Sequence, residues 1–249
     1  MVKNFIINKY LDKTMFQNRK AVINALKGGL IVSCQPTVGG PFDSVESVTH
    51  FAVAAKEGGC QGLRIEGAER VAAVVKDIDL PVVGIVKRDL TDSDVRITPF
   101  LEDVEALASA GATIIAFDAT ERPRPVGSDA LLSRIHELGC LAMADCATFE
   151  EGRQMAAMGC DLIASTLSGY VGDSDQKEPD LELVAQWARV GIPVIAEGRY
   201  RTAEQARQAL ENGALAVTVG SAITRPEMVT GWFVEEMRQS VSSSSLKAL

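Results

Sequence analysis

The chain has 249 residues, of which 47% are hydrophobic and 23% charged, and its formal net charge is −8. This length and balance are typical of one globular domain and exclude a wholly disordered chain. The acidic excess does not favour binding to nucleic acid or to an anionic membrane. We therefore expect neither partner, and a bound anion would have to be held by a local arginine or a helix N-terminus.

Five cysteines are scattered along the chain without a CxxC spacing: Cys34, Cys60, Cys140, Cys146 and Cys160. Such thiols are typical of buried residues in a reducing compartment. The first ten residues are too briefly apolar for a secretory signal, and no apolar run has the length of a membrane span. The sequence thus predicts a soluble, cytoplasmic protein.

The first segment, residues 1–14, has no clear place in a domain plan, and we interpret it as an N-terminal extension, with Met15 as an alternative start of translation. Apolar residues at Phe16, Val22, Ile23 and Leu26 predict a short amphipathic helix over residues 15–27. After it, the chain repeats a short aliphatic run, a polar loop and an amphipathic helix.

Eight aliphatic runs in this rhythm predict strands: Leu30 to Gln35, Gly62 to Ile65, Pro81 to Lys87, Thr113 to Asp118, Leu141 to Asp145, Asp161 to Thr166, Pro193 to Glu197 and Ala216 to Gly220. Eight amphipathic segments predict the helices: Ser44 to Glu57, Ala68 to Lys76, Pro99 to Ser109, Ser128 to Glu137, Thr148 to Met158, Leu181 to Arg189, Thr202 to Glu211 and Pro226 to Gln239. Thr148 and Thr202 have the pattern of N-caps. Six glycines are expected as left-handed residues after helices: Gly58, Gly111, Gly139, Gly159, Gly191 and Gly213.

Eight strands alternating with helices require parallel pairing and right-handed crossovers. In a chain of this length they predict a single (β/α)8 TIM barrel, with the short N-terminal helix covering its bottom. Residues 15–240 would form this catalytic domain, and residues 241–249 a flexible, serine-rich tail. A doubly wound open sheet is the alternative, but no GxGxxG follows the first strand.

Polar residues stand at the end of each predicted strand: Gln35, Arg64, Lys87, Asp118, Asp145, Thr166, Glu197 and the pair Gly220-Ser221. In a barrel these ends meet at one open face, where active sites form. Charges gathered there would be costly unless they pair with one another or bind a ligand. The sequence therefore predicts one constellation of polar groups at the barrel mouth.

Lys87 and Glu197 end the third and seventh strands, on opposite sides of the ring. Neighbouring arginines and partial burial would lower the pKa of Lys87 and make it a usable base near neutral pH. A structural ion pair across the barrel is the alternative. Asp118 and Asp145 have three open roles: binding substrate hydroxyls, positioning Lys87, or capping a loop.

The loops after strands seven and eight, EGRYRT and VGSAITRP, have the composition of a phosphate site. The glycines Gly198 and Gly220 allow backbone N–H groups to approach an anion, and Ser221 adds a hydroxyl. Arg199 and Arg225 supply charge. Barrel enzymes frequently hold a phosphate at these two strand ends, although ordinary loop glycines are the alternative.

The two histidines, His50 and His136, fall inside predicted helices and not at strand ends. A barrel enzyme that uses a metal would be expected to place imidazole ligands at the mouth. We therefore expect no metal and no cofactor. No cysteine follows a strand beside a histidine, so a thiol–imidazole nucleophile is not indicated.

With these residues in view, the chain resembles the N-acetylmannosamine-6-phosphate 2-epimerases of bacterial sialic acid catabolism, from Leu26 to Met237. The motifs that carry the resemblance are KGGLIVSCQ (27–35), LRIEG (63–67), GIVKRDL (84–90), FDATERPRP (117–125), MADCAT (143–148), TLSGY (166–170), AEGRY (196–200) and VGSAITRP (219–226). The chain departs from the family in the residues before Met15 and at Leu90, where a tyrosine is expected after KRD.

The resemblance implies an isomerase that interconverts N-acetylmannosamine 6-phosphate and N-acetylglucosamine 6-phosphate by moving the C2 proton. It implies a catalytic lysine at Lys87 and a partner acid at Glu197. The implied substrate contacts are Gln35, Arg64 and Asp145, and the implied phosphate contacts are Gly198, Gly220, Ser221 and Arg225. Glu197 would assist ring opening or the second proton transfer, and a Schiff base on Lys87 stays open as an alternative.

The implied partner is thus a small phosphorylated amino sugar. Two other classes stay open: another cofactor-free phosphosugar isomerase, and a sugar-phosphate sensor without catalysis. A homodimer is the assembly considered, because barrels often dimerise through their helices, but no residue in the sequence identifies the interface.

Overall fold

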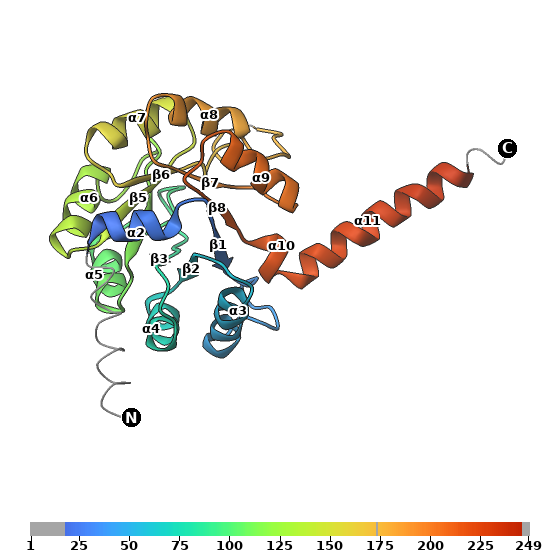
Figure 1. Cartoon of the computed structure of the whole chain (residues 1–249), viewed down its shortest axis with the longest axis horizontal. Coiled ribbons are helices and arrows are strands. Elements are labelled where there is room, and N and C mark those ends of the chain that lie inside the picture. The colour runs from blue at the N-terminus through green and yellow to red at the C-terminus, as the bar shows by residue number, and fades with distance from the viewer. Residues whose placement is uncertain (1–17, 173, 246–249) are drawn as a thin grey trace.

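The protein's structure, a computed structural model, describes residues 18–172 and 174–245. Eight parallel strands pair in sequence order, and the last pairs with the first to close a barrel. The strands are β1 (Gly29–Cys34), β2 (Gly62–Glu66), β3 (Val82–Ile85), β4 (Ile114–Asp118), β5 (Leu141–Asp145), β6 (Leu162–Ala164), β7 (Val194–Glu197) and β8 (Ala216–Val219) (Figure 1). This confirms the predicted TIM barrel and excludes the open doubly wound sheet.

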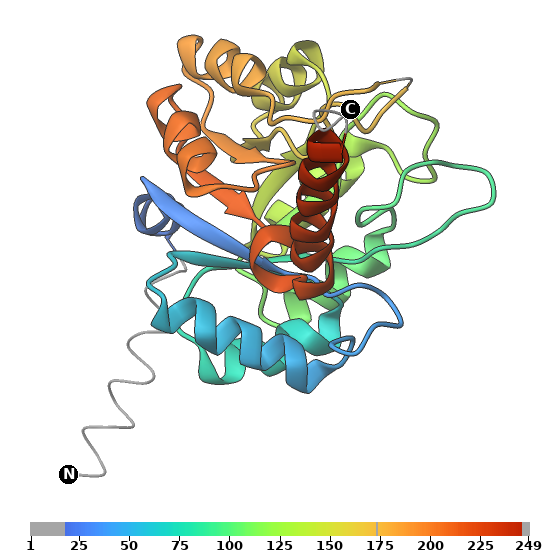
Figure 2. The same cartoon turned by 90° about the vertical axis from the view of Figure 1, so that its right-hand side faces the viewer.

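Helices follow the strands and surround the barrel, as the view from the side of the last helix shows (Figure 2). They are α2 (Arg19–Leu26), α3 (Val45–Glu57), α4 (Ala68–Asp77), α5 (Leu101–Ser109), α6 (Ser128–Glu137), α7 (Phe149–Ala157), α8 (Leu181–Arg189), α9 (Ala203–Glu211), α10 (Ser221–Thr224) and α11 (Pro226–Ser245). Helix α11 projects away from the barrel body (Figure 1). Among the described helices, none is long and apolar enough to cross a membrane.

The hydrophobic core forms two layers because successive side chains of a strand point to opposite faces. One layer lies between the sheet and the outer helices and includes Ile65, Phe117 and Trp187. The other fills the inside of the barrel. Val22 and Leu26 of α2 belong to this inner layer, so α2 closes the bottom of the barrel as predicted.

Local sequence signals set several helix ends. Thr148 and Thr202 both form capping boxes, with Glu151 and Gln205 as the reciprocal partners, as their patterns predict. The left-handed residue after α3 is Gly59, with a φ of +88°, whereas Gly58 caps the helix in a right-handed conformation with a φ of −70°. The turn after α3 therefore comes one residue later than predicted.

Three boundaries differ from the sequence prediction. Strand β3 ends at Ile85, so Lys87 lies beyond it in an antiparallel bridge with Ile97. The short helix α10 follows β8 directly. Helix α11 continues to Ser245, into the segment predicted to be a flexible tail. The predicted N-terminal extension, residues 1–14, and the last four residues lie outside the described residues.

The contact between α7 and α8 gives a test of the packing. A Cβ atom on Gly152 would come within 3.0 Å of the Trp187 ring, whose Nε1 donates a hydrogen bond to the Phe149 carbonyl at 3.0 Å. Because Trp187 is fully buried, it has little room to move. We expect Gly152→Ala to lower the free energy of unfolding by about 1–3 kcal/mol.

Thermal unfolding of the two proteins measures this effect. Gly231→Ala is the matched control, because Gly231 lies in α11, where an added Cβ atom would meet no other atom within 4 Å, and alanine favours a helix. The control should unfold at the wild-type temperature or slightly above it. An unchanged unfolding temperature for Gly152→Ala would contradict the packing described.

Candidate active site

An open cavity of about 470 Å³ lies at the carboxyl ends of the strands. Eight of the ten predicted site residues line it: Gln35, Lys87, Glu197, Gly198, Arg199, Gly220, Ser221 and Arg225. The other two, Arg64 and Asp145, are buried and do not line it. The predicted polar residues therefore lie in two layers: eight line the cavity, and the buried Arg64 and Asp145 lie beneath them.

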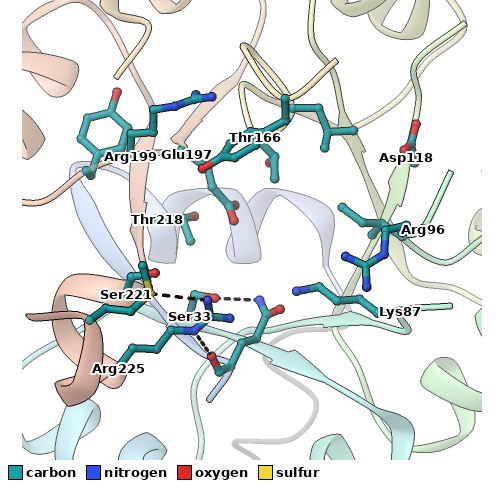
Figure 3. Close-up of a pocket in the computed structure, with 18 of the residues that line it drawn as sticks. Ser33, Lys87, Arg96, Asp118, Thr166, Glu197, Arg199, Thr218, Ser221 and Arg225 are labelled. Carbon is teal, nitrogen blue, oxygen red and sulfur yellow. Dashed lines mark hydrogen bonds between the residues drawn. The ribbon is translucent and has the colours of Figure 1, made fainter. Parts of the chain in front are cut away.

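A short hairpin places Lys87 at the cavity. After β3 the backbone pairs with the returning segment, since Thr98 N donates to the Val86 carbonyl at 2.7 Å and Arg88 N donates to the Arg96 carbonyl at 3.0 Å. Thr98 turns the chain with a φ of +48°, and its hydroxyl donates to the Ala116 carbonyl of β4 at 2.7 Å. The Lys87 side chain points into the cavity (Figure 3).

The Lys87 ammonium group has no hydrogen-bond or ion-pair partner among the described side chains, so the structure forms no ion pair between Lys87 and Glu197. The side chain meets solvent through the open cavity, yet protein encloses it on most sides. This partial burial, followed by the charges of Arg64 and Arg225, lowers the pKa of Lys87 to about 8. A measurable fraction of Lys87 is therefore neutral near pH 7.

Beneath the cavity, three charged groups from three strands form one network. Arg64 of β2 donates two hydrogen bonds to the Asp145 carboxylate of β5, at 3.1 and 2.6 Å. Its Nη1 also donates to Oε2 of Glu197 on β7 at 2.9 Å. The side-chain exposure of Arg64 is 1%, that of Asp145 is 0% and that of Glu197 is 13%. In this structure, Arg64 connects with the cavity through Glu197, and Asp145 connects with it also through the Thr166 hydroxyl, which donates to Asp145 at 2.6 Å.

Negative charges outnumber positive charges in the network when both carboxylates are ionised, because Asp145 and Glu197 share the single guanidinium group of Arg64. Burial is the largest cause that raises the pKa of Glu197, and the Asp145 carboxylate raises it further, although Arg64 lowers it. Burial alone would lower the pKa of Arg64, but Asp145 and Glu197 hold it above its ordinary value. Glu197 is thereby more easily protonated than an exposed glutamate.

Asp118 organises a loop. Its buried carboxylate accepts hydrogen bonds from Arg122 at 2.6 Å and from Arg124 at 3.2 Å, and it also accepts one from the Thr120 backbone at 3.0 Å. Both arginines belong to the ERPRP motif. The structure thus shows a loop-capping role for Asp118. Asp118 also lines the cavity, so the two other roles left open by the sequence stay predictions.

The two predicted phosphate loops meet at one side of the cavity. Gly198 has a φ of +109°, and a Cβ atom on Gly220 would lie 3.2 Å from the Ser33 Cβ atom, so both positions favour glycine. Ser221 begins α10. The Arg225 Nε donates to the Gln35 carbonyl at 2.8 Å, which fixes its side chain at the cavity (Figure 3).

Arg199 is engaged with a neighbouring loop. Its guanidinium donates to the carbonyls of Ser168 and Gly169, both at 2.6 Å, and lies 3.9 Å from the centre of the Tyr170 ring. The backbone of Arg199 is strained, with a φ of +62°. Arg199 therefore ties the end of β7 to the loop after β6.

Several residues that line the cavity were not predicted from the sequence, including Arg96, Tyr170, Arg201 and Thr218. Arg96 and Tyr170 lie on long loops, where no periodic pattern indicates the direction of a side chain. Thr218 had a usable signal, because it alternates with valines in β8 and is the pairing partner of Glu197. Within residues 18–172 and 174–245, no group of three or more His, Cys, Asp or Glu side chains could hold a metal ion.

Comparison with known proteins agrees with this geometry. Residues 48–239 match a family described as "Putative N-acetylmannosamine-6-phosphate epimerase". A Vibrio vulnificus protein named "Putative N-acetylmannosamine-6-phosphate 2-epimerase" is 54% identical over 223 residues, which are 88% of this chain and 99% of that protein. A Brucella melitensis protein named "Bifunctional enzyme NanE/NanK" is 53% identical over 90% of this chain, and the match spans 43% of that longer protein.

A solved structure supports the same grouping. The N-acetylmannosamine-6-phosphate 2-epimerase from Clostridium perfringens superimposes with a TM-score of 0.83 and 39% sequence identity, covering 86% of this chain and 95% of that one. The resemblance seen in the sequence motifs is therefore confirmed, and the chain belongs to the N-acetylmannosamine-6-phosphate epimerase family.

Proposed function

We propose that this protein interconverts N-acetylmannosamine 6-phosphate and N-acetylglucosamine 6-phosphate by moving the proton at C2. One observation supports this best: Lys87 and Glu197 reach a single cavity from opposite sides of the barrel, with pKa values shifted toward each other. Family membership supplies the substrate class. A base and an acid on opposite sides fit inversion of one carbon centre.

The chemistry requires an open-chain sugar. Opening the pyranose ring exposes the C1 aldehyde, which makes the C2 proton acidic. One group removes that proton from one face and leaves an enolate, and a second group delivers a proton to the other face. Ring closure then gives the epimer, and no electrons are gained or lost.

In this proposal, Lys87 and Glu197 are the two groups and carry one proton between them. With Lys87 protonated and Glu197 ionised, the carboxylate removes the C2 proton and the ammonium group protonates the opposite face. The reverse reaction starts from neutral Lys87 and protonated Glu197. The raised pKa of Glu197 and the lowered pKa of Lys87 reduce the difference in free energy between these two arrangements.

The substrate's phosphate is proposed to bind at Gly198, Gly220, Ser221 and Arg225, which share one side of the cavity. Arg199 lies beside them, with its guanidinium on the Ser168 and Gly169 carbonyls, and its phosphate contact stays a prediction. Gln35 is proposed to bind sugar oxygens or the acetamido group, since its Oε1 is buried without a partner in the described structure. Direct substrate contacts by Arg64 and Asp145 also stay predictions.

We also propose a homodimer, in which a second copy of this chain covers α11. This 20-residue helix projects from the barrel, and its Phe233 side chain is 68% exposed (Figure 1). The guanidinium of Arg201 lies 5.0 Å from the centre of the Trp232 ring, which fixes the base of the helix against the barrel. A large exposed aromatic residue on a projecting helix is typical of an interface. The cytoplasm is the proposed location, supported by five free thiols.

The pH dependence of the reaction tests the two-group mechanism. The active enzyme holds one proton on the Lys87–Glu197 pair. A plot of kcat/KM against pH should therefore be bell-shaped for the forward and for the reverse reaction. Activity should fall above about pH 8, where Lys87 loses its proton and no acid remains. It should also fall at low pH, with a midpoint above the ordinary glutamate range, where Glu197 gains a proton and no base remains.

The variant Lys87→Arg tests whether Lys87 causes the loss of activity at high pH, because a guanidinium group keeps the positive charge but does not release its proton. We expect kcat/KM to fall by about 100-fold or more while substrate affinity is largely kept. Lys76→Arg is the matched control, since Lys76 is exposed on α4 and does not line the cavity, and it should stay within about twofold of wild type. A kcat/KM that does not change between pH 6 and 9.5, or a Lys87→Arg variant with wild-type activity, would contradict the proposal.

The assembly is tested at Phe233. We expect Phe233→Asp to convert the dimer into monomers, because a charge would have to be buried at the interface. Sedimentation velocity at several protein concentrations measures the change. Glu236→Gln, also exposed on α11, should remain dimeric. A wild-type protein that sediments as a monomer at all concentrations would contradict the proposed homodimer.

A further inference from the structure

Thr218 of β8 is a buried residue whose side chain points into the barrel. Its neighbours Val217 and Val219 pack in the outer layer between sheet and helices, whereas Ala216 packs in the inner one. By the alternation of a strand, Thr218 faces inward with Ala216. It is 2% exposed and lines the cavity.

Thr218 is also the direct neighbour of Glu197. The two residues are paired in the register between β7 and β8, and Glu197 likewise faces inward, because Ile195 belongs to the inner layer and Ala196 to the outer one. Side chains of paired residues on parallel strands lie beside each other on the same face. Figure 3 shows both side chains next to each other at the cavity.

The Thr218 hydroxyl is unsatisfied. Its Oγ1 is buried and has no partner at ordinary hydrogen-bond geometry in the described structure, yet it lies close enough to the Glu197 carboxylate to lower the pKa of that group. Two other hydroxyl groups at the cavity are engaged: Ser33 Oγ accepts from Gln35 at 2.7 Å, and Thr166 Oγ1 donates to Asp145 at 2.6 Å. Glu197 uses Oε2 for Arg64, which leaves its Oε1 available. A free hydroxyl thus lies next to a carboxylate oxygen with spare capacity.

We propose that Thr218 is a positioning residue, whose hydroxyl holds the Glu197 side chain and bonds to it in both of its protonation states. The proposal rests on the proton transfer assigned to Glu197 above. A hydroxyl group donates its hydrogen to the ionised carboxylate and can rotate to accept one from the carboxylic acid. Because the ionised form gains the stronger bond, Thr218 lowers the pKa of Glu197.

The other groups that act on Glu197 come from three further strands. They are Arg64 on β2, Asp145 on β5 and Lys87 after β3, while Ser165 after β6 bonds only the Glu197 backbone. Arg64 and Asp145 are locked to each other by two hydrogen bonds. Thr218 is therefore a neutral group whose removal changes the environment of Glu197 without removing a charge.

The direct test is the titration of Glu197 in the free enzyme. Carbon-13 NMR of protein labelled at the glutamate carboxyl carbon, with Glu197→Gln to assign the signal, gives the pKa without any substrate. Thr218→Val removes the hydroxyl and keeps the shape, and we expect it to raise the pKa of Glu197 by about one unit. Thr218→Ser keeps the hydroxyl and should restore most of the wild-type value.

Kinetics give the second measurement. For Thr218→Val we expect the acid limb of kcat/KM to move to higher pH by the same amount, kcat to fall about tenfold, and KM to change less than twofold. Thr113→Val is the matched control, because Thr113 lies before β4 at the other end of the barrel, where its hydroxyl accepts a bond from the Val82 backbone. It should leave the pKa of Glu197 and the pH profile unchanged.

Two results would overturn the proposal. One is an unchanged Glu197 pKa in Thr218→Val. The other is an increase of KM with an unchanged acid limb, which would make Thr218 a substrate contact instead. A wild-type protein without epimerase activity would defeat the proposed function, yet the NMR titration would still decide the role of Thr218.

Discussion

The arrangement of the mouth depends on the buried contact between Arg64, Asp145 and Glu197. These residues come from β2, β5 and β7, so the contact reaches across the barrel. Removing three charges from water is costly unless their geometry is held firmly, and a closed ring of paired strands supplies that rigidity. Burial of this network is the main cause that raises the pKa of Glu197, and the second carboxylate, Asp145, adds to the increase although Arg64 opposes it.

The same network acts on Lys87 from the other side of the cavity. The positive charge of Arg64 reinforces the effect of partial burial and lowers the pKa of Lys87, while Glu197 is shifted upward. An acid and a base whose pKa values approach each other can exchange roles in the two directions of one reaction. When a substrate is held between such a pair, one group can remove a proton from one face of a carbon and the other group can deliver a second proton to the opposite face.

Much of the fold follows from sequence alone, because periodicity and capping act locally. All eight strands were expected within two residues of their observed ends, and the Thr148 and Thr202 caps formed as their patterns indicate. The displaced turn at Gly59 shows the limit of this reasoning. Two adjacent glycines are equally suited to a left-handed conformation, and only the length of the helix decides between them.

The site was less predictable, because it depends on partners that are distant in the sequence. Strand ends indicated Lys87 and Glu197, but the hairpin that carries Lys87 forms only when Ile97 returns to pair with it. Arg199 was expected at a phosphate, yet its guanidinium meets two backbone carbonyls of another loop. Thr218 was not predicted, because a threonine between valines in a strand has the pattern of an ordinary packed residue. Its proposed role depends on its pairing with Glu197 in the neighbouring strand, which the sequence does not show.

Exchange of the C2 proton between two groups on opposite faces is the step on which the proposed mechanism depends. Proton NMR of N-acetylmannosamine 6-phosphate and enzyme in heavy water, at low conversion and with a chelator present, tests it most directly. We expect the gluco epimer to carry deuterium at C2 from the first turnovers, while the remaining substrate keeps its proton. Deuterium that appears equally in both sugars, or a product that retains the original proton, would contradict the two-group mechanism.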